Sequence, residues 1–255
     1  MRRDKAALSS SCYGKLMKIG ILEPGAPPSA LRERFGDYGA MFRAILGEGF
    51  EAVSFDVAHG AWPDSPEALP AWLITGSSAG VYDERPWIAP LMAFLRAAKG
   101  RSAIVGICFG HQIMAQAFSG QVVKSPKGWG IGLHRYAVQA PQPWMGSGVE
   151  RGGEFAIPAS HQDQVVVAPS GAVVTASSAF TPYAGLAYDD GRSISFQGHP
   201  EFDPAYAAAL ITSRRGSLFA EDQATAAITS LNEPNDRGRV AEWIRAFLRT
   251  GLEAE

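Results

Sequence analysis

The chain has 255 residues, 46% of them hydrophobic, and a formal net charge of −2 at pH 7. The apolar fraction is typical of a globular protein with a full core. The near-neutral charge gives no electrostatic reason for nucleic acid or a membrane surface as a partner, and we expect neither. Cys12 and Cys108 are too few for a disulfide framework, which favours a cytoplasmic setting. No apolar run approaches the ~20 residues that cross a bilayer.

The first fifteen residues are basic and polar, and they lack the apolar stretch of a signal peptide. We therefore expect residues 1–15 to form a disordered leader, with Met17 as a candidate natural start and Cys12 without a functional role. Neither a linker nor an internal repeat divides the remaining sequence. Residues 16–255 are accordingly expected to form a single domain.

The first half of the chain alternates short apolar runs with segments of helical periodicity. The apolar runs predict strands at 16–22, 52–57, 71–75 and 103–107. Apolar residues at helical spacing predict helices at 31–46, 87–98 and 112–119. Such alternation implies a mostly parallel sheet covered on both faces, in which ligands bind at the carboxyl ends of the strands.

From residue 121 onward, short strands separated by turn residues dominate the pattern. They are predicted at 121–124, 132–139, 154–157, 165–168, 173–177, 185–188 and 193–197. The last helices are predicted at 205–215, 221–230 and 239–249. The fold expected from these elements is α/β: a flavodoxin-like, open, mostly parallel sheet flanked by helices, with an added antiparallel β portion in the C-terminal half.

Cys108 occupies the turn between a predicted buried strand and the helix that follows. Gly106 and Gly110 flank it at two residues on either side, which is the spacing of a nucleophile elbow with Cys in place of Ser. The N-terminus of the following helix would stabilise a thiolate at this position. A packed cysteine beside an ordinary glycine turn explains these residues equally well, since free Cys is often buried.

His199 lies at the carboxyl end of a predicted strand, and Glu201 follows two residues later. In an extended segment this spacing places both side chains on one side, where the carboxylate can orient the imidazole. Cys108, His199 and Glu201 are therefore a candidate triad of the acyl-transfer type. Taken alone, His199 fits a surface turn histidine better. His111 is expected to serve packing or hydrogen bonding.

An oxyanion hole requires two preorganised amide donors. In elbow enzymes the residue after the nucleophile supplies one of them, and here that residue is Phe109. Gly76, at the end of a predicted strand, is the candidate for the second because glycine permits close backbone approach. The glycine-rich segment 76–80 also fits an ordinary turn or a weak phosphate loop, although it lacks the lysine of a P-loop.

Together, four segments resemble the class I glutamine amidotransferase family in motif, order and spacing. They are Ile74-Thr-Gly-Ser-Ser78 with Val81-Tyr-Asp83, Gly106-Ile-Cys-Phe-Gly-His-Gln112, Ser160-His-Gln-Asp-Gln-Val165 and Gln197-Gly-His-Pro-Glu201. They are similar, in that order, to the oxyanion strand, the nucleophile signature, the substrate loop and the His-Pro-Glu signature of the family. The resemblance extends from residue 17 to about residue 203.

The resemblance implies hydrolysis of the γ-amide of glutamine through a γ-glutamyl thioester. Cys108 would attack the γ-carbonyl, His199 would transfer protons, and Glu201 would orient and stabilise the imidazolium. The amides of Gly76 and Phe109 would hold the oxyanion. Ammonia would pass to an unidentified acceptor, and no cofactor or metal is implied.

The family pattern also implies how glutamine is held. The side chain of Gln112 and the main chain of Ser160, Gln162 and Asp163 would bind it. Two positions depart from the pattern: Gln162 replaces a glycine common in the substrate loop, and Gly130 stands where near relatives often carry an acidic residue. Either departure could shift substrate preference.

The chain carries no ATP motif of the synthetases that such glutaminases serve, so it most resembles the stand-alone, GMP-synthase-like branch. A separate synthetase is one candidate partner. Some members of this branch are γ-glutamyl peptidases, and a stand-alone hydrolase of γ-glutamyl peptides or amines is the alternative function. A non-catalytic regulatory module on the same fold is the second alternative, against which the intact triad argues.

Overall fold

The computed structural model describes residues 16–250, so the predicted leader and Cys12 lie outside the described residues. The strands are β1 (Met17–Leu22), β2 (Phe50–Phe55), β3 (Ala71–Ile74), β4 (Ala103–Ile107), β5 (Gln121–Lys124), β6 (Gly130–Val138), β7 (Glu154–His161), β8 (Asp163–Val167), β9 (Val173–Ser177), β10 (Gly185–Ala187) and β11 (Ser193–Phe196). The α-helices are α1 (Ser29–Phe35), α2 (Tyr38–Leu46), α3 (Ile88–Ala98), α4 (Phe109–Ala117), α5 (Pro204–Arg214), α6 (Glu221–Ser230) and α7 (Arg237–Thr250). Short 3₁₀ turns occupy η1 (Val57–His59) and η2 (Pro143–Met145).

Within the described chain, nine strands form one large sheet in the order β2-β1-β3-β4-β11-β10-β9-β6-β7. The five strands from β2 to β11 run parallel, and the remaining pairs are antiparallel. The parallel part has the strand order of a flavodoxin-like sheet. β5 and β8 form a separate two-stranded sheet. The predicted α/β fold with an antiparallel portion is therefore confirmed.

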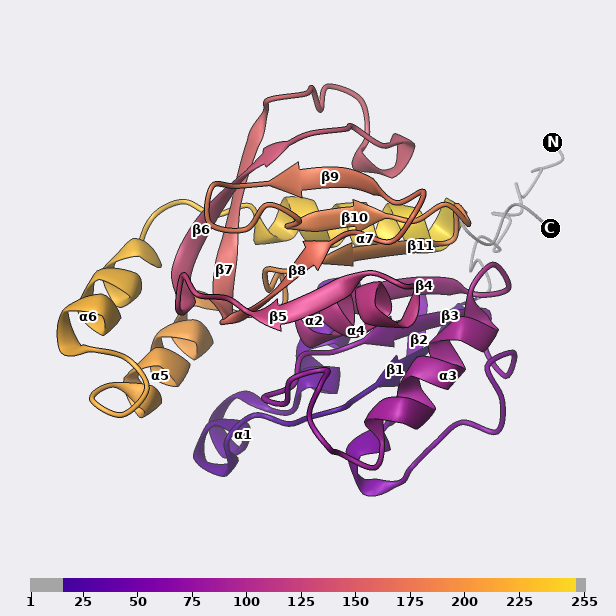
Figure 1. Cartoon of the computed structure of the whole chain (residues 1–255), viewed down its shortest axis with the longest axis horizontal. Helices are drawn as coiled ribbons and strands as arrows, with labels where there is room; N and C mark the ends of the chain where they lie inside the picture. Colours follow the sequence, from indigo (N-terminus) through magenta and orange to yellow (C-terminus); the bar gives the residue numbers. More distant parts are fainter. Residues whose placement is uncertain (1–15, 251–255) are drawn as a thin grey trace, which may run out of the picture.

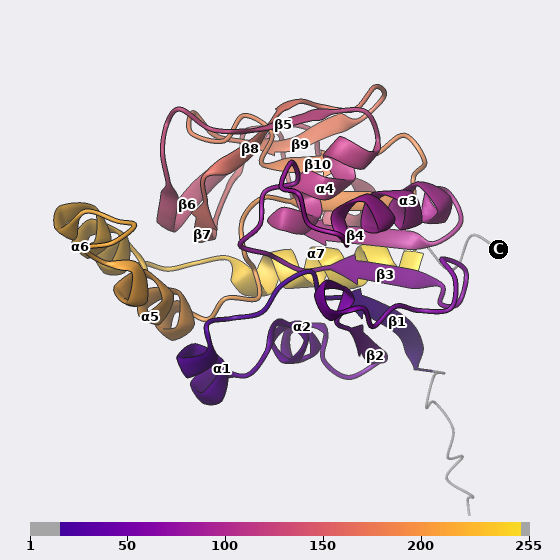
Figure 2. The ribbon, with the colours of Figure 1, turned by 60° about the horizontal axis from the view of Figure 1, so that its bottom comes forward.

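Helices cover both faces of the sheet, as the apolar sequences of the central strands require (Figures 1 and 2). One core contains Phe42 and Leu46 of α2 and the buried aromatic and aliphatic side chains of α7, together with Ile19, Leu73 and Val105. The other core contains those of α3 and α4 together with Trp72 and Ile104. Alternate residues of the same strands thus point to opposite cores, and the strand ends are left free to carry polar groups.

A third cluster holds α5 and α6 at one end of the molecule, beyond β6 and β7 (Figure 1). Phe202 and Tyr206 lie at its centre, and the two rings meet edge to face at 4.6 Å between centroids. Phe202 also stacks on Tyr38 at 6.0 Å, which ties α5 to the start of α2. This packing sets the direction of α5 relative to the carboxyl ends of the parallel strands.

Several predicted boundaries are wrong. The helix predicted at 31–46 is two helices, because Gly36 adopts φ +83° and Asp37 begins a new helix by accepting a 2.6 Å hydrogen bond from the amide of Ala40. The helix predicted at 112–119 begins earlier, at Phe109. β7 continues to His161 rather than ending at 157, because it pairs with β6 along its whole length.

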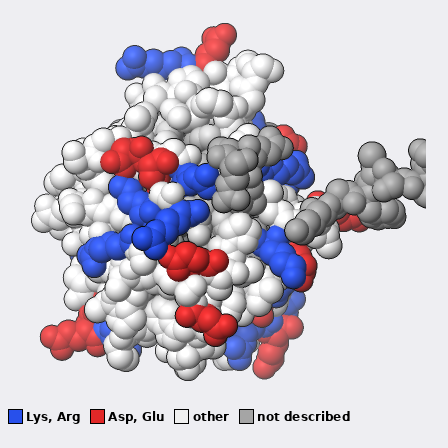
Figure 3. Space-filling model, turned by 90° about the vertical axis from the view of Figure 1, so that its right-hand side faces the viewer, with Lys and Arg blue, Asp and Glu red and all other residues white. Residues whose placement is uncertain are grey.

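The surface mixes charges of both signs. On the face shown in Figure 3, basic side chains lie directly beside acidic ones. Among the helices of residues 16–250, none combines the length and apolar character needed to span a bilayer.

Candidate active site

Cys108 lies at a sharp turn where β4 passes into α4. Its backbone has φ 55° and ψ −104°, a conformation that residues with a side chain rarely adopt. The Cys108 amide donates a 2.9 Å hydrogen bond to the carbonyl oxygen of Phe196 on β11, which fixes the turn to the sheet. The side chain projects from the strand end beside the first turn of α4. This is the geometry of a nucleophile elbow.

Close packing explains why Gly106 and Gly110 flank the elbow. A Cβ on Gly110 would overlap the carbonyl oxygen of Ile74 at the end of β3. A Cβ on Gly106 would lie 2.6 Å from the main chain of Gly110 and would overlap the sulfur of Met114. These glycines let α4 approach the ends of β3 and β4 closely, which brings Cys108 beside the neighbouring strand end.

His199 and Glu201 follow β11, the strand that is adjacent to β4. The amide of His199 is held by the carbonyl oxygen of Pro158 at 2.8 Å, and its Nδ1 lies 2.7 Å from Oε1 of Glu201. The two side chains are only 4% and 0% exposed. Phe202 stacks on the imidazole with ring centroids 3.8 Å apart. The ring is therefore fixed in position from three sides, and the expected reach of Glu201 to His199 is confirmed.

Charge determines the protonation of this imidazole. Burial on its own would lower the pKa of His199, but the negative charges of a Cys108 thiolate and of Glu201 outweigh burial and raise the pKa to about 10. The arrangement thus favours the imidazolium form of His199 at neutral pH. The charged ring has a proton ready for a leaving group.

The other buried histidines behave differently. His111 and His161 are fully enclosed, and burial lowers the pKa of each to about 3, so both rings are neutral. His111 is hydrogen-bonded through Nδ1 to Oγ of Ser195 at 2.7 Å, which confirms its predicted hydrogen-bonding role. His199 is the buried histidine whose surroundings favour the charged form.

Gly76 and Phe109 lie on either side of this pair. A Cβ on Gly76 would be 3.3 Å from Cε1 of His199 and 3.9 Å from Cβ of Cys108, so the Gly76 main chain lies against both residues. Phe109 begins α4, and the amides of a first helical turn have no partner within the helix. Its side chain is turned away and packs edge to face on Trp87.

The predicted substrate-binding residues form one wall of the same site. Ser160, Gln162 and Asp163 line a cavity together with Cys108. Gln112 reaches this wall from α4, where its Nε2 donates to the carbonyl oxygen of Asp163 at 2.8 Å. Every residue proposed from sequence for the triad, for the oxyanion contacts and for substrate binding therefore comes to one end of the parallel sheet.

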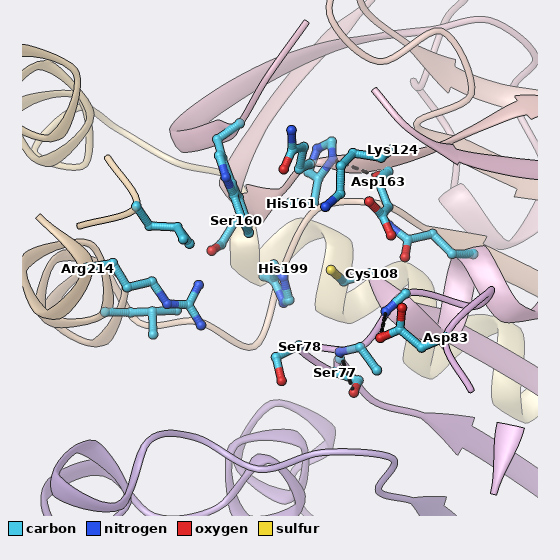
Figure 4. A pocket seen from close by; sticks show the side chains of 18 of the residues that line it. Ser77, Ser78, Asp83, Cys108, Lys124, Ser160, His161, Asp163, His199 and Arg214 are labelled. Carbon is cyan, nitrogen blue, oxygen red and sulfur yellow. Dashed lines mark hydrogen bonds between the residues drawn. The ribbon is translucent and has the colours of Figure 1, made fainter. Parts of the chain in front are cut away.

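The cavity has a volume of about 360 Å³ and contains groups that sequence reasoning missed. Lys124 and Arg214 both line it, and Figure 4 shows them on different sides of the site. Lys124 lies near Asp163, whereas Arg214 lies beyond His199. Sequence reasoning could have found Lys124, because it is the last residue of a predicted strand and ligands often bind at strand ends. Arg214 is a helical residue without any motif.

Among residues 16–250, His, Cys, Asp and Glu side chains nowhere form a group of three or more that could hold a metal ion. The groups brought together around the cavity are a cysteine, a charged histidine, a carboxylate and main-chain amides.

Comparisons with known proteins agree with the fold. Residues 73–214 match the family model described as glutamine amidotransferase class-I. A glutamine amidotransferase-like protein of Schizosaccharomyces pombe is 29% identical over 253 residues, covering 90% of this chain and 98% of the relative. Gamma-glutamyl peptidase 4 of Arabidopsis thaliana is 30% identical over 178 residues, covering 68% of this chain and 70% of the peptidase. The crystal structure of a glutamine amidotransferase from Thermotoga maritima superposes with a TM-score of 0.72 at 16% identity, covering 94% of this chain and 100% of that one.

Proposed function

The chain belongs to the class I glutamine amidotransferase family, and we propose that it hydrolyses γ-glutamyl amide bonds with Cys108 as nucleophile, His199 as proton carrier and Glu201 as the group that orients His199. The observation that carries the proposal is the buried, oriented His199, whose pKa is raised to about 10 beside Cys108. A histidine that served packing alone would be neutral, as His111 is.

In the first half-reaction, the Cys108 thiolate attacks the γ-carbonyl carbon and a C–S bond forms. The amides of Gly76 and Phe109 stabilise the negative charge that develops on the oxygen. His199 gives its proton to the departing nitrogen, and the C–N bond breaks. A γ-glutamyl thioester remains on Cys108, and ammonia or an amine leaves.

In the second half-reaction, His199 takes a proton from water as the oxygen attacks the thioester. The C–S bond then breaks, glutamate leaves, and Cys108 and His199 return to their charged pair. Glu201 keeps Nδ1 protonated throughout, so that Nε2 is the atom that exchanges protons. The buried position of Glu201 holds the ring in this orientation.

The charges of the cavity match the amino-acid end of a γ-glutamyl substrate. That end carries one positive α-amino and one negative α-carboxylate group. Lys124 and Asp163 line the same side of the cavity, and the charge of Lys124 acts on Asp163. With Gln112 and the main chain of Ser160 and Gln162, they are the groups that we assign to the γ-glutamyl head.

Two fates of the nitrogen distinguish the candidate functions. With glutamine as substrate, ammonia passes to an acceptor, which a synthetase partner would carry. With a γ-glutamyl peptide or amine, the amine itself is the product. The second function is favoured by the size of the cavity, which continues past His199 as far as Arg214.

The test is release of glutamate from glutamine and from a panel of γ-glutamyl peptides, with Cys108→Ala and Cys108→Ser as variants. We expect measurable turnover by the wild type and a loss of at least about 10³-fold in either variant. Wild-type turnover that survives Cys108→Ala would refute the nucleophile. Absence of turnover for every γ-glutamyl compound would favour the regulatory module.

A further inference from the structure

The two sides of the cavity take different parts of a γ-glutamyl substrate. Gln112 and Asp163 lie on the side assigned above to the γ-glutamyl head. The leaving nitrogen must receive the proton of His199, so it lies on the side of the imidazole. In Figure 4, the space beyond His199 leads to Arg214 and away from Lys124 and Asp163. Whatever is attached to the leaving nitrogen therefore extends toward Arg214.

Arg214 is the last residue of α5, and its side chain points from that helix into the cavity (Figure 4). Its charge acts on the hydroxyl groups of Tyr38 and Tyr206, where it lowers the pKa of each against the larger effect of burial. Among the described residues Arg214 has no ion-pair partner. By contrast, Arg215 pairs with Glu221. Arg214 thus brings an unneutralised, half-buried guanidinium to the leaving-group side.

The surroundings of Arg214 are aromatic and apolar. Four residues that line the cavity lie next to Arg214: the charge of Arg214 acts on Tyr38, Phe202 stacks on Tyr38, Leu210 is one turn earlier in α5, and the amide of Leu218 donates to the carbonyl oxygen of Arg214. We call these four residues the leaving-group wall. Ammonia as a leaving group needs neither an apolar wall nor a cation. A guanidinium beside tyrosine and leucine side chains suits a ligand with an apolar body and a carboxylate.

We propose that Arg214 determines the leaving group: it binds the carboxylate of an apolar or aromatic amino acid whose α-nitrogen is joined to the γ-carbonyl of glutamate. The inference rests on the proposed function and names its substrate class, γ-glutamyl amino acids with an apolar side chain. In the reaction, the γ-carbonyl C–N bond breaks, the nitrogen takes the proton of His199, and the amino acid leaves with its carboxylate on Arg214.

The matched probes are γ-glutamyl-phenylalanine and γ-glutamyl-phenethylamine, which differ by the carboxylate alone. We expect the wild type to prefer the first in kcat/KM. Arg214→Gln should lower the ratio of the two kcat/KM values about 10- to 100-fold, the usual worth of one charge-assisted hydrogen bond. Arg151→Gln, in the exposed turn at the far end of the β6–β7 hairpin, removes the same charge and should keep the wild-type ratio.

Two further variants keep the test decisive if Arg214→Gln folds poorly. Arg214→Lys retains the charge without the planar fork and should give an intermediate ratio. Arg214→Glu should reverse the preference toward the γ-glutamyl conjugate of a diamine. An unchanged ratio in Arg214→Gln, or a wild type indifferent to the carboxylate, would overturn the inference. If the wild type hydrolysed glutamine normally in that case, the proposed function would stand without it.

Discussion

Replacement of Glu201 by Gln tests the coupling between charge and catalysis at the site. Oε1 of Glu201 lies 2.7 Å from Nδ1 of His199, and the Glu201 side chain has no exposed surface. Gln has almost the same shape and retains an oxygen that can accept from Nδ1. The variant therefore removes the negative charge while it preserves packing, so its effect reports the interaction with the imidazolium.

The magnitude follows from the hydrogen bond. A buried hydrogen bond to a charged group contributes about 1.5 to 3 kcal/mol, and about 1.36 kcal/mol corresponds to one pH unit. The pKa of His199 is raised to about 10, so the imidazolium is present at neutral pH and is lost as pH rises through that value. Without the charge of Glu201 this loss begins earlier. The alkaline limb of activity should therefore move about 1 to 2 pH units lower.

The assay is kcat/KM for glutamate release from glutamine, measured from pH 6 to pH 10.5 for the wild type and for Glu201→Gln. The same 1.5 to 3 kcal/mol corresponds to a decrease of about 10- to 100-fold at neutral pH. Glu233→Gln, which changes an exposed partner of Arg135, controls for charge. An alkaline limb that stays where the wild type has it would refute the argument that Glu201 stabilises the imidazolium of His199, even if the rate fell.

Two glycine substitutions separate folding from chemistry. Gly110→Ala places a methyl group on the carbonyl oxygen of Ile74 and should lower the free energy of unfolding in urea by about 1 to 3 kcal/mol. The control is Gly238→Ala, whose methyl group meets nothing within 4 Å and should not lower the free energy of unfolding. Equal unfolding midpoints for the two variants would contradict the packing argument. Gly76→Ala places a methyl group 3.3 Å from Cε1 of His199. It should lower kcat/KM for glutamine about tenfold, with a smaller effect on the urea midpoint. Full activity of this variant would show that the end of β3 does not touch the reacting groups.

The parallel sheet was predictable because its strands are continuous apolar runs, and β5, β9 and α6 have the predicted bounds. The break between α1 and α2 was missed for a local reason. Apolar residues continue at helical spacing across Gly36 and Asp37, and periodicity alone cannot detect a new helix start. The signal was present in Asp37, since Asp is a favoured N-cap.

Some residues of the site could likewise be predicted from the sequence and others could not. Cys108, His199 and Glu201 were accessible to sequence reasoning because they directly follow two predicted strands, β4 for Cys108 and β11 for His199 and Glu201. Arg214 was not, since its position depends on the direction of α5. That direction is set by contacts of Phe202 with Tyr38, which is 164 positions earlier in the chain, and no local pattern reports such a contact.

The segment from His199 to Arg214 connects the proposed proton carrier to the proposed leaving-group site. Phe202 stacks on the imidazole of His199 and also on Tyr38. Asp203 then caps α5 by accepting a hydrogen bond from the amide of Ala205 at 2.8 Å, and α5 ends at Arg214. The histidine is fixed to the sheet by the main chain of Pro158 and by Glu201. Helix α5 is held by side-chain contacts: the packing beyond Phe202, the hydrogen bond from Tyr206 to Tyr38 at 3.5 Å and the ion pair of Asp203 with Arg237 at 3.6 Å. If the proposed function holds, we therefore expect changes in α5 to alter the group at the far side of the γ-carbonyl while the proposed reacting residues stay in place. On this proposal, proteins that share the triad need not share a leaving group.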